Sequence, residues 1–298
     1  AAKKIAMEYS PENEIPYIAQ VDAGTIELIR SFGVEVVSSG DLVQLFEARW
    51  SSEQTKSHFE AVKRVDETKE EGFRFIAKNL RAGRKISEYD VQQHMWRVFE
   101  QKAITADHPA IVAVNANASD PHYSPTADRS SPISVGDLVL IDIWGKLKDL
   151  DSIYGDVTWM GYAGAEVPKR YQDVFRIVKE AQHQALQLIR ANFQKGVATY
   201  GWQADEAARS HIMQAGYGEY FLHRLGHSIG RSVHGNGANL DNLETRDRRK
   251  LIAHTGFSIE PGIYLPDFGV RSEFDVYIGD EGPVVTSPEQ IEIVALLS

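Results

Sequence analysis

The stretch that decides the fold is LVLIDIW, residues 138–144, in which Asp142 interrupts a run of branched and aromatic residues. Short apolar runs rich in Val and Ile and bounded by Gly, Pro or Asp are typical of strands. An unpaired carboxylate on an apolar strand is costly to bury, so its charge must be compensated. We therefore expect a strand at this place that carries an acid bound to a cation.

Four other donors lie in similar apolar surroundings. They are Asp156 in YGDVT (154–158), His227 in HRLGHSIG (223–230), Glu260 in FSIEPG (257–262) and Glu273 in GVRSEFDV (269–276). The chain has no cysteine, so a metal must be held by His, Asp and Glu, which favour hard or borderline divalent ions. Taken singly, an acid on a strand often pairs with Arg and a lone His is usually structural. The joint occurrence of five such donors is what predicts a metal site.

Around these motifs the order helix, helix, strands occurs twice. Amphipathic patterns predict helices at 53–80, 87–102, 168–192 and 199–215, and apolar runs predict strands at 110–114, 138–143, 153–160, 257–264 and 270–278. Two short helices are expected within residues 14–47. An internal duplication around one shared sheet is the simplest interpretation of this order, and two coincidentally similar helix pairs are the alternative.

Composition restricts the class of partner. The 298 residues are 43% hydrophobic and 25% charged, as in ordinary globular proteins, and the net charge of -10 argues against binding of a nucleic-acid backbone. No apolar run approaches the length of a membrane span, so a membrane partner is not expected and a cytoplasmic location is the default. The chain begins AAKK without Met, from which we expect an upstream segment, and any targeting signal in it, to be missing.

The ordered motifs resemble those of the pita-bread metallopeptidases, which include methionine aminopeptidase, aminopeptidase P and prolidase. The resemblance rests on Asp142, GDVT (155–158), HxxGHxxGxxVH (223–234), EPG (260–262) and GVRxExDV (269–276), and covers residues 53–298. It implies an α+β pita-bread fold, with duplicated helix-helix-strand units around a curved, mostly antiparallel sheet, and a catalytic domain at 51–298. Residues 1–50 are similar to the end of a creatinase-type N-terminal domain.

The resemblance also implies roles for individual residues. Asp156 and Glu273 would bridge two divalent ions, Asp142 would complete one site, and His227 with Glu260 would complete the other. Glu260 would transfer the proton, and His122, His223 and His234 would contact the substrate. Arg271 and Thr158 would orient the carboxylates. Manganese is the first expectation for the metal, with zinc, cobalt or iron as alternatives.

Within the family, two features favour the proline-specific members. PHYSPT (121–126) resembles their substrate-histidine segment, and His223 resembles their additional active-site histidine. Two departures limit the match. Thirteen residues separate Asp142 from Asp156, an insertion of three, which places Asp149 and Asp151 in the hairpin as expected solvated acids. His234 is followed by GNG, where relatives commonly carry an acid.

The expected activity is hydrolysis of the bond before proline in Xaa-Pro dipeptides or longer peptides, by a homodimer or larger homo-oligomer. Two alternatives stay open: a catalytically inactive pita-bread binding module, and a dimetal hydrolase of another small amide or ester. The remaining histidines have no motif around them and are expected at the surface or in packing; they are His58, His94, His108, His183, His211 and His254.

Overall fold

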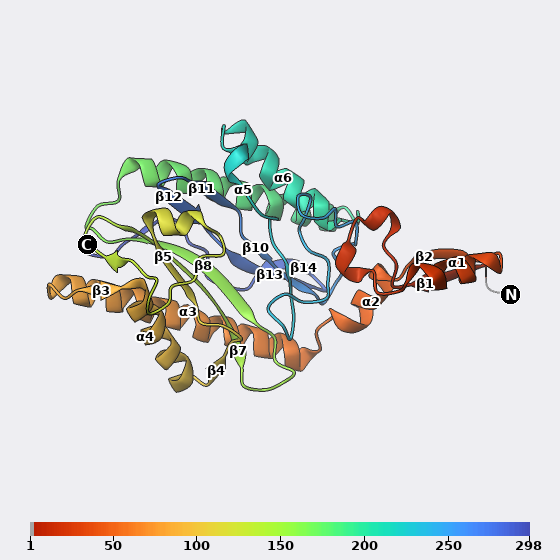
Figure 1. The fold of residues 1–298 in the computed structure, drawn as a ribbon, viewed down its shortest axis with the longest axis horizontal. Coiled ribbons are helices and arrows are strands. Elements are labelled where there is room, and N and C mark those ends of the chain that lie inside the picture. Colours follow the sequence, from red (N-terminus) through yellow and green to blue (C-terminus); the bar gives the residue numbers. More distant parts are fainter. Residues whose placement is uncertain (1–2) are drawn as a thin grey trace.

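The computed structural model describes residues 3–298 and contains two pairs of long or medium helices on either side of a set of strands (Figure 1). The helices are α1 (Ala23–Ser31), α2 (Gly40–Glu47), α3 (Ser52–Arg81), α4 (Glu88–Gln101), α5 (Lys169–Gln194) and α6 (Gly201–Gln214). Four short 3-10 segments are η1 (Pro11–Asn13), η2 (Pro16–Ile18), η3 (Asn115–Ser119) and η4 (Gly218–Tyr220).

The strands before α5 are β1 (Lys4–Met7), β2 (Glu35–Ser38), β3 (Ile86–Ser87), β4 (Ile104–Thr105), β5 (Ile111–Val114), β6 (Pro132–Ile133), β7 (Leu138–Leu147) and β8 (Gly155–Tyr162). Those after α6 are β9 (Ser228–Ile229), β10 (Gly256–Ile259), β11 (Gly262–Leu265), β12 (Phe268–Arg271), β13 (Phe274–Gly279), β14 (Gly282–Val285) and β15 (Val294–Ala295). Helix, helix, strands therefore follow one another twice along the chain.

Strand pairing is mostly antiparallel. β7 pairs with β8 from Leu138 opposite Tyr162 to Gly145 opposite Gly155. In the second half β10 pairs with β13 and β11 pairs with β12, both antiparallel. Among the pairs within residues 3–298, β1 with β2 and β8 with β15 are parallel. The expected α+β class with a mostly antiparallel arrangement is confirmed.

The two helix pairs cover opposite faces of the central strands, with α3 and α4 below and α5 and α6 above in Figure 1. Side chains alternate across a strand. Ile141 and Ile143 of β7 accordingly join the apolar cluster that contains residues of α3 and α4. Leu138 and Leu140, on the other face, join the cluster that contains residues of α5 and α6.

Local signals set the helix starts that the sequence predicts. Ser51 and Gln54 form a reciprocal capping box at α3, and Ser87 and Asp90 form another at α4. Each box satisfies backbone N–H groups that the first helical turn leaves without partners. None of the helices in residues 3–298 is both long enough and apolar enough to cross a lipid bilayer.

Two expected strands are wrong in one respect, because each is broken in the middle. The expected strand 257–264 is divided into β10 and β11 at Glu260 and Pro261, and the expected strand 270–278 is divided into β12 and β13 at Ser272 and Glu273. Pro261 has no backbone N–H for a ladder. The Glu260 N–H instead donates to the Leu225 carbonyl (2.8 Å), outside the strand pairing.

Residues 3–50 form a small α/β segment that packs against the loop before β10. The Tyr17 hydroxyl accepts from Arg249 Nη2 (3.1 Å), and Gln44 Nε2 donates to the Lys250 carbonyl (3.1 Å). Trp50, just beyond α2, is buried and donates from Nε1 to the Ile229 carbonyl (3.2 Å). The interpretation of residues 1–50 as the end of a separate domain stays a prediction, and Ala1 and Ala2 lie outside the described residues.

Candidate metal centre

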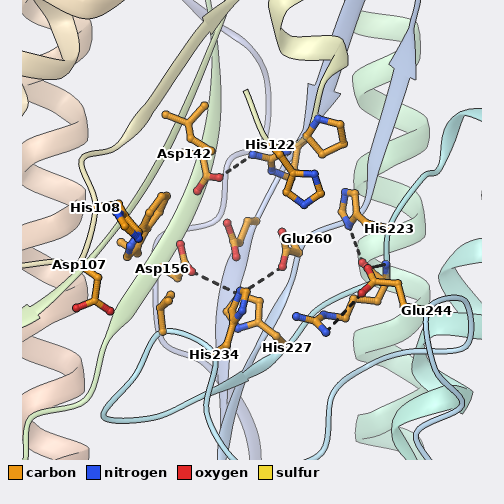
Figure 2. Close-up of a pocket in the computed structure, with 17 residues that line it drawn as sticks. Asp107, His108, His122, Asp142, Asp156, His223, His227, His234, Glu244 and Glu260 are labelled. Carbon is orange, nitrogen blue, oxygen red and sulfur yellow. Dashed lines mark hydrogen bonds and ion pairs between the residues drawn. The ribbon is translucent and has the colours of Figure 1, made fainter. Parts of the chain in front are cut away.

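All of the predicted donors and histidines of the site line one cavity of about 570 Å³, shown in Figure 2. The predicted residues in its wall are Asp142, Asp156, His227, Glu260, Glu273, His122, His223, His234 and Arg271. Thr158, the other predicted residue, lies directly behind this wall and donates to Glu273 Oε2 (2.7 Å). Segments more than a hundred residues apart in sequence therefore meet at one place.

The first two carboxylates lie within continuous strands. Asp142 of β7 is opposite Thr158 of β8, and Trp144 is opposite Asp156. Because alternate residues of a strand share a face, these four side chains lie on the same face of the hairpin. Strand register alone thus brings Asp142 and Asp156 to the cavity.

The other two carboxylates stand at the strand breaks. Glu260 follows β10, and Glu273 lies between β12 and β13. The Glu273 N–H donates to the Thr158 carbonyl (3.1 Å), which places Glu273 against the first-half hairpin. The gap in each strand is therefore the place where a ligand is presented.

A buried cluster of acids forms around His227. Its Nε2 lies 3.5 Å from Asp156 Oδ2 and 3.4 Å from Glu260 Oε1. One potential ligand atom each from Asp156, His227 and Glu273 lie within 4.8 Å of one another. Three donors at such spacing are a geometry that can hold a cation.

The electrostatics of the cluster also fit a cation. Burial and the neighbouring Asp142 raise the pKa of Asp156 well above its ordinary value, and burial with the neighbouring Asp156 does the same to the pKa of Glu273. Burial raises the pKa of Glu260 to about 7. Asp156 Oδ1 and Glu273 Oε1 are buried without a hydrogen-bond partner among residues 3–298. Bound divalent cations would favour the charged form of these carboxylates and would provide a partner for the two buried oxygens.

Arg271 connects the two halves of the cluster. Its Nη2 donates to Asp142 Oδ2 (2.7 Å), and its Nε donates to Thr158 Oγ1 (3.3 Å), which in turn bonds Glu273. Its Nη1 donates to the Tyr264 hydroxyl (2.8 Å). The predicted pairing of Arg271 with Asp142 is present in this geometry, and the guanidinium also orients Thr158 and Tyr264.

The three predicted substrate histidines differ in their surroundings. The His234 ring lies 4.3 Å from the His227 ring, centroid to centroid, and is exposed toward the cavity, as is His122. His223 is held at both nitrogens: Nδ1 lies 2.7 Å from the Arg224 carbonyl and Nε2 lies 2.6 Å from the Tyr264 hydroxyl. Burial lowers the pKa of His223 to about 3, so its imidazole is neutral. A direct substrate contact by His223 stays a prediction.

The hairpin acids lie away from the cavity. Asp149 and Asp151 are exposed in the turn between β7 and β8, where Asp149 Oδ1 accepts from the Asp151 N–H (2.8 Å). Neither residue lines the metal-site cavity. The geometry thus places Asp156, and not the hairpin acids, beside the other donors.

Sequence reasoning missed several residues of the site. Asp275 is fully buried, and its Oδ2 accepts from the Asp156 N–H (2.8 Å). Tyr264 links Arg271 to His223. His108, which we expected to have only a surface or packing role, lines the cavity beside Asp107. Asp275 stood in the quoted GVRxExDV motif and could have been found there, whereas His108 has no motif around it.

Comparisons with known proteins agree with this geometry. The model of metallopeptidase family M24 matches residues 60–280. An Xaa-Pro dipeptidase from Lactobacillus helveticus is 35% identical over 166 residues, which are 55% of this chain and 40% of that protein. This chain therefore spans less than half of that relative's length.

Two solved structures show the same fold. A prolidase from Thermococcus sibiricus has a TM-score of 0.71 and 26% identity, over 93% of this chain and 70% of that chain. An X-prolyl aminopeptidase from Caenorhabditis elegans, described as a cytosolic enzyme with a dinuclear active site, has a TM-score of 0.71 and 21% identity, over 90% of this chain and 44% of that chain. The expected pita-bread fold is confirmed. Because the family model matches most of its length, this chain belongs to metallopeptidase family M24.

Proposed function

We propose that the protein binds two divalent metal ions and hydrolyses the peptide bond that precedes proline. The observation that carries the proposal is the convergence of five donors on one cavity in which buried oxygens of Asp156 and Glu273 have no partner among residues 3–298. Such oxygens are rare in folded proteins, and a bound ion is one of the features that account for them. The neighbour from Caenorhabditis elegans, described as dinuclear, supports the number of ions.

In this proposal the two ions would be held by the five donors of the cavity, Asp142, Asp156, His227, Glu260 and Glu273. Divalent ions, when bound, lower the pKa of water toward neutrality and polarise a carbonyl. Manganese is the proposed metal, because carboxylates and one imidazole make up the donor set.

Glu260 is the proposed proton carrier. Ser258 Oγ donates to its Oε1 (3.2 Å), and its carboxylate lines the cavity among the other donors, where a positioned side chain can accept and return a proton. Glu260 would accept the proton of the attacking water and deliver it to the departing amine nitrogen. Proton acceptance and return by one carboxylate account for both halves of the hydrolysis.

His234 and His122 are the proposed donors to the substrate carbonyl. Both line the cavity, and neither side chain has a hydrogen bond within residues 3–298, so both are available to a ligand. Donors directed at the oxygen that gains negative charge stabilise the transition state. His223, held by Tyr264, would contribute mainly by fixing the shape of this wall.

Specificity for proline is proposed from the names of the relatives and from the chemistry of the ring. Similar proteins include an Xaa-Pro dipeptidase and a prolidase. Proline offers no N–H and has a fixed φ, so a site must recognise the ring and place the carbonyl by side chains. His122, His223 and His234 are suited to this task. A homo-oligomer, a cytoplasmic location and an N-terminal domain remnant at residues 1–50 stay predictions.

The test is a panel of Xaa-Pro dipeptides, Xaa-Pro-Yaa tripeptides and Met-Ala peptides with manganese-loaded protein. We expect cleavage only before proline, and loss of activity with a chelator. His234→Ala should reduce turnover about 100-fold with metal content unchanged, the effect of losing one oxyanion donor. Equal cleavage of Met-Ala and Ala-Pro would remove the proline assignment. Metal-loaded protein that cleaves no peptide would favour a binding module or another amide substrate.

A further inference from the structure

A buried glutamine of α5 contacts the backbone at both strand breaks that carry metal-site glutamates. Gln182 is fully buried, and its Nε2 donates to the Ile259 carbonyl (2.8 Å) and to the Ser272 carbonyl (3.1 Å). Ile259 directly precedes Glu260, and Ser272 directly precedes Glu273. One side-chain amide therefore contacts both breaks, whose flanking strands pair with each other, β10 with β13 and β11 with β12.

The orientation of this amide is determined by its three partners. Two carbonyls require the NH₂ group, and Oε1 accepts from Lys179 Nζ at 2.5 Å. Lys179 is itself buried, and its Nζ lies 5.3 Å from the ring centroid of Phe274, the residue after Glu273. A flipped amide would place its oxygen against two carbonyl oxygens and its NH₂ against an ammonium group. Lys179 thus fixes Gln182 in the state that joins the two breaks.

The two breaks lie opposite each other, between the pairs Ile259–Phe274 and Gly262–Arg271, and one long backbone bond joins them, from the Ser272 N–H to the Pro261 carbonyl (3.4 Å). At Pro261 the backbone has no N–H, and the N–H groups of Glu260 and Glu273 donate to Leu225 and Thr158, outside the strand pairs of β10 and β12. Gln182 takes up the carbonyls that precede these two residues. Gln182 therefore adds two side-chain bonds at a place where the backbone itself supplies one long bond.

We propose that Gln182 is a positioning residue that sets the spacing of Glu260 and Glu273 for metal binding, and that Lys179 orients its amide. The inference rests on the proposed metal function. Side chains behind the ligands of metal sites tune affinity by holding the ligands in place. Gln182, on α5, bonds the backbone directly before two predicted ligands at once.

A second buried glutamine provides a matched control. Gln290, 2% exposed, bonds the backbone of Met160 through Oε1 (2.8 Å) and Nε2 (2.6 Å), and bonds the Glu292 carbonyl (3.0 Å). It also joins separate segments of the fold, but it contacts no residue next to a predicted ligand. Replacing either glutamine by methionine keeps the approximate volume and removes the amide.

The experiment is a calorimetric titration of metal-free protein with Mn²⁺ for wild type, Gln182→Met and Gln290→Met, together with melting temperatures. Both variants should melt at lower temperature. Gln182→Met should raise the dissociation constant for Mn²⁺ about tenfold. This is the lower end of the loss of affinity seen when a group that supports metal ligands is replaced. Gln290→Met should bind Mn²⁺ as wild type does. A Gln182→Met dissociation constant within twofold of wild type, or an equal loss in Gln290→Met, would overturn the positioning role.

Lys179→Met carries the test if Gln182→Met does not fold. It keeps both donors of Gln182 and removes the group that orients them, so we expect a smaller loss of Mn²⁺ affinity, at least about threefold. Unchanged affinity in that variant overturns the proposal. A wild-type protein that binds no Mn²⁺ would instead remove the proposed metal function, which separates the two failures.

Discussion

The two halves of the candidate metal centre present their carboxylates by different structural means. In the first half, Asp142 and Asp156 lie inside β7 and β8, whose ladder continues past both residues. In the second half, Glu260 and Glu273 stand where the strand pattern stops. A continuous ladder fixes side chains through register, whereas at a break groups from elsewhere in the fold add to the few bonds between the strands.

The groups that fix the second half come from three separate segments. The Leu225 carbonyl accepts from the Glu260 N–H, the Thr158 carbonyl accepts from the Glu273 N–H, and Gln182 donates to the residues before both. The first half thus supplies local rigidity and the second half depends on tertiary contacts. Metal binding should therefore respond to substitutions in the two halves in different ways.

The largest expected effect belongs to Asp156, inside the first-half ladder. Asp156→Asn should lower metal-dependent turnover by more than about 1,000-fold, beyond the 10- to 100-fold typical of residues that only orient ligands. The same change should raise the melting temperature of the metal-free protein, because burial and the neighbouring Asp142 raise the pKa of Asp156 and disfavour its charge. Peptide hydrolysis and thermal melting with and without chelator measure the two effects.

The hairpin acids are the controls for this variant. Asp149→Asn and Asp151→Asn should be nearly silent in both assays, since both side chains are exposed and lie outside the cavity. If Asp149→Asn or Asp151→Asn lost activity while Asp156→Asn stayed active, the proposed metal ligand would be a hairpin acid and not Asp156.

A second, smaller effect concerns pH and the second half. Burial raises the pKa of Glu260 from 4.5 to about 7 in the metal-free fold. The folded protein then binds a proton that the unfolded chain has released, so stability is retained below pH 4.5 and lost as pH rises through 7. The Glu260→Gln variant has no carboxyl group at this position, so it does not lose stability in this way as pH rises. We expect the variant to gain stability over wild type by up to about 1.4 kcal/mol per pH unit across this window.

The difference between the two proteins removes the contribution of titrating groups outside the cluster, such as His58. Burial lowers the pKa of His58 to about 4, and this residue destabilises the fold as pH falls below 6.5 in wild type and variant alike. Urea unfolding of both metal-free proteins at several pH values gives the difference directly. Parallel stability curves from pH 4.5 to 7 would contradict the raised pKa of Glu260.

Sequence reasoning found the first half of the site more completely than the second. The apolar run LVLIDIW is a local signal, and the structure has the predicted strand there, with helix starts near the predicted ones that Ser51 and Ser87 cap. The breaks at Glu260 and Glu273 were not predicted, because the bonds that replace the ladder come from Leu225 and Thr158.

Two residues that act across the layers were missed for a related reason. Gln182 reads as one polar position on an amphipathic helix, and His108 has no motif around it. Their positions at the strand breaks and at the cavity arise only when distant segments pack together. Periodicity identifies which face of an element is apolar but does not identify the backbone group that a buried amide meets.

The smallest expected effect tests the one hydroxyl that joins the halves. Thr158 Oγ1 donates to Glu273 Oε2 (2.7 Å) and accepts from Arg271 Nε (3.3 Å), so a side chain of the continuous ladder orients a carboxylate at a break. Thr158→Val keeps the shape and removes both bonds. We expect Mn²⁺ affinity to fall about tenfold, as when a group behind a ligand is lost.

A buried threonine elsewhere separates this effect from a general loss of stability. Thr68 of α3 is also fully buried and donates to the Arg64 carbonyl (2.7 Å), within its own helix. Thr68→Val should leave Mn²⁺ affinity unchanged in the same titration. If Thr158→Val also binds Mn²⁺ as wild type does, the backbone bond from Glu273 to the Thr158 carbonyl suffices to hold this ligand, together with the bond from Arg271 to Asp142 that also joins the halves. If affinity falls only in Thr158→Val, the second-half ligand depends on a first-half side chain.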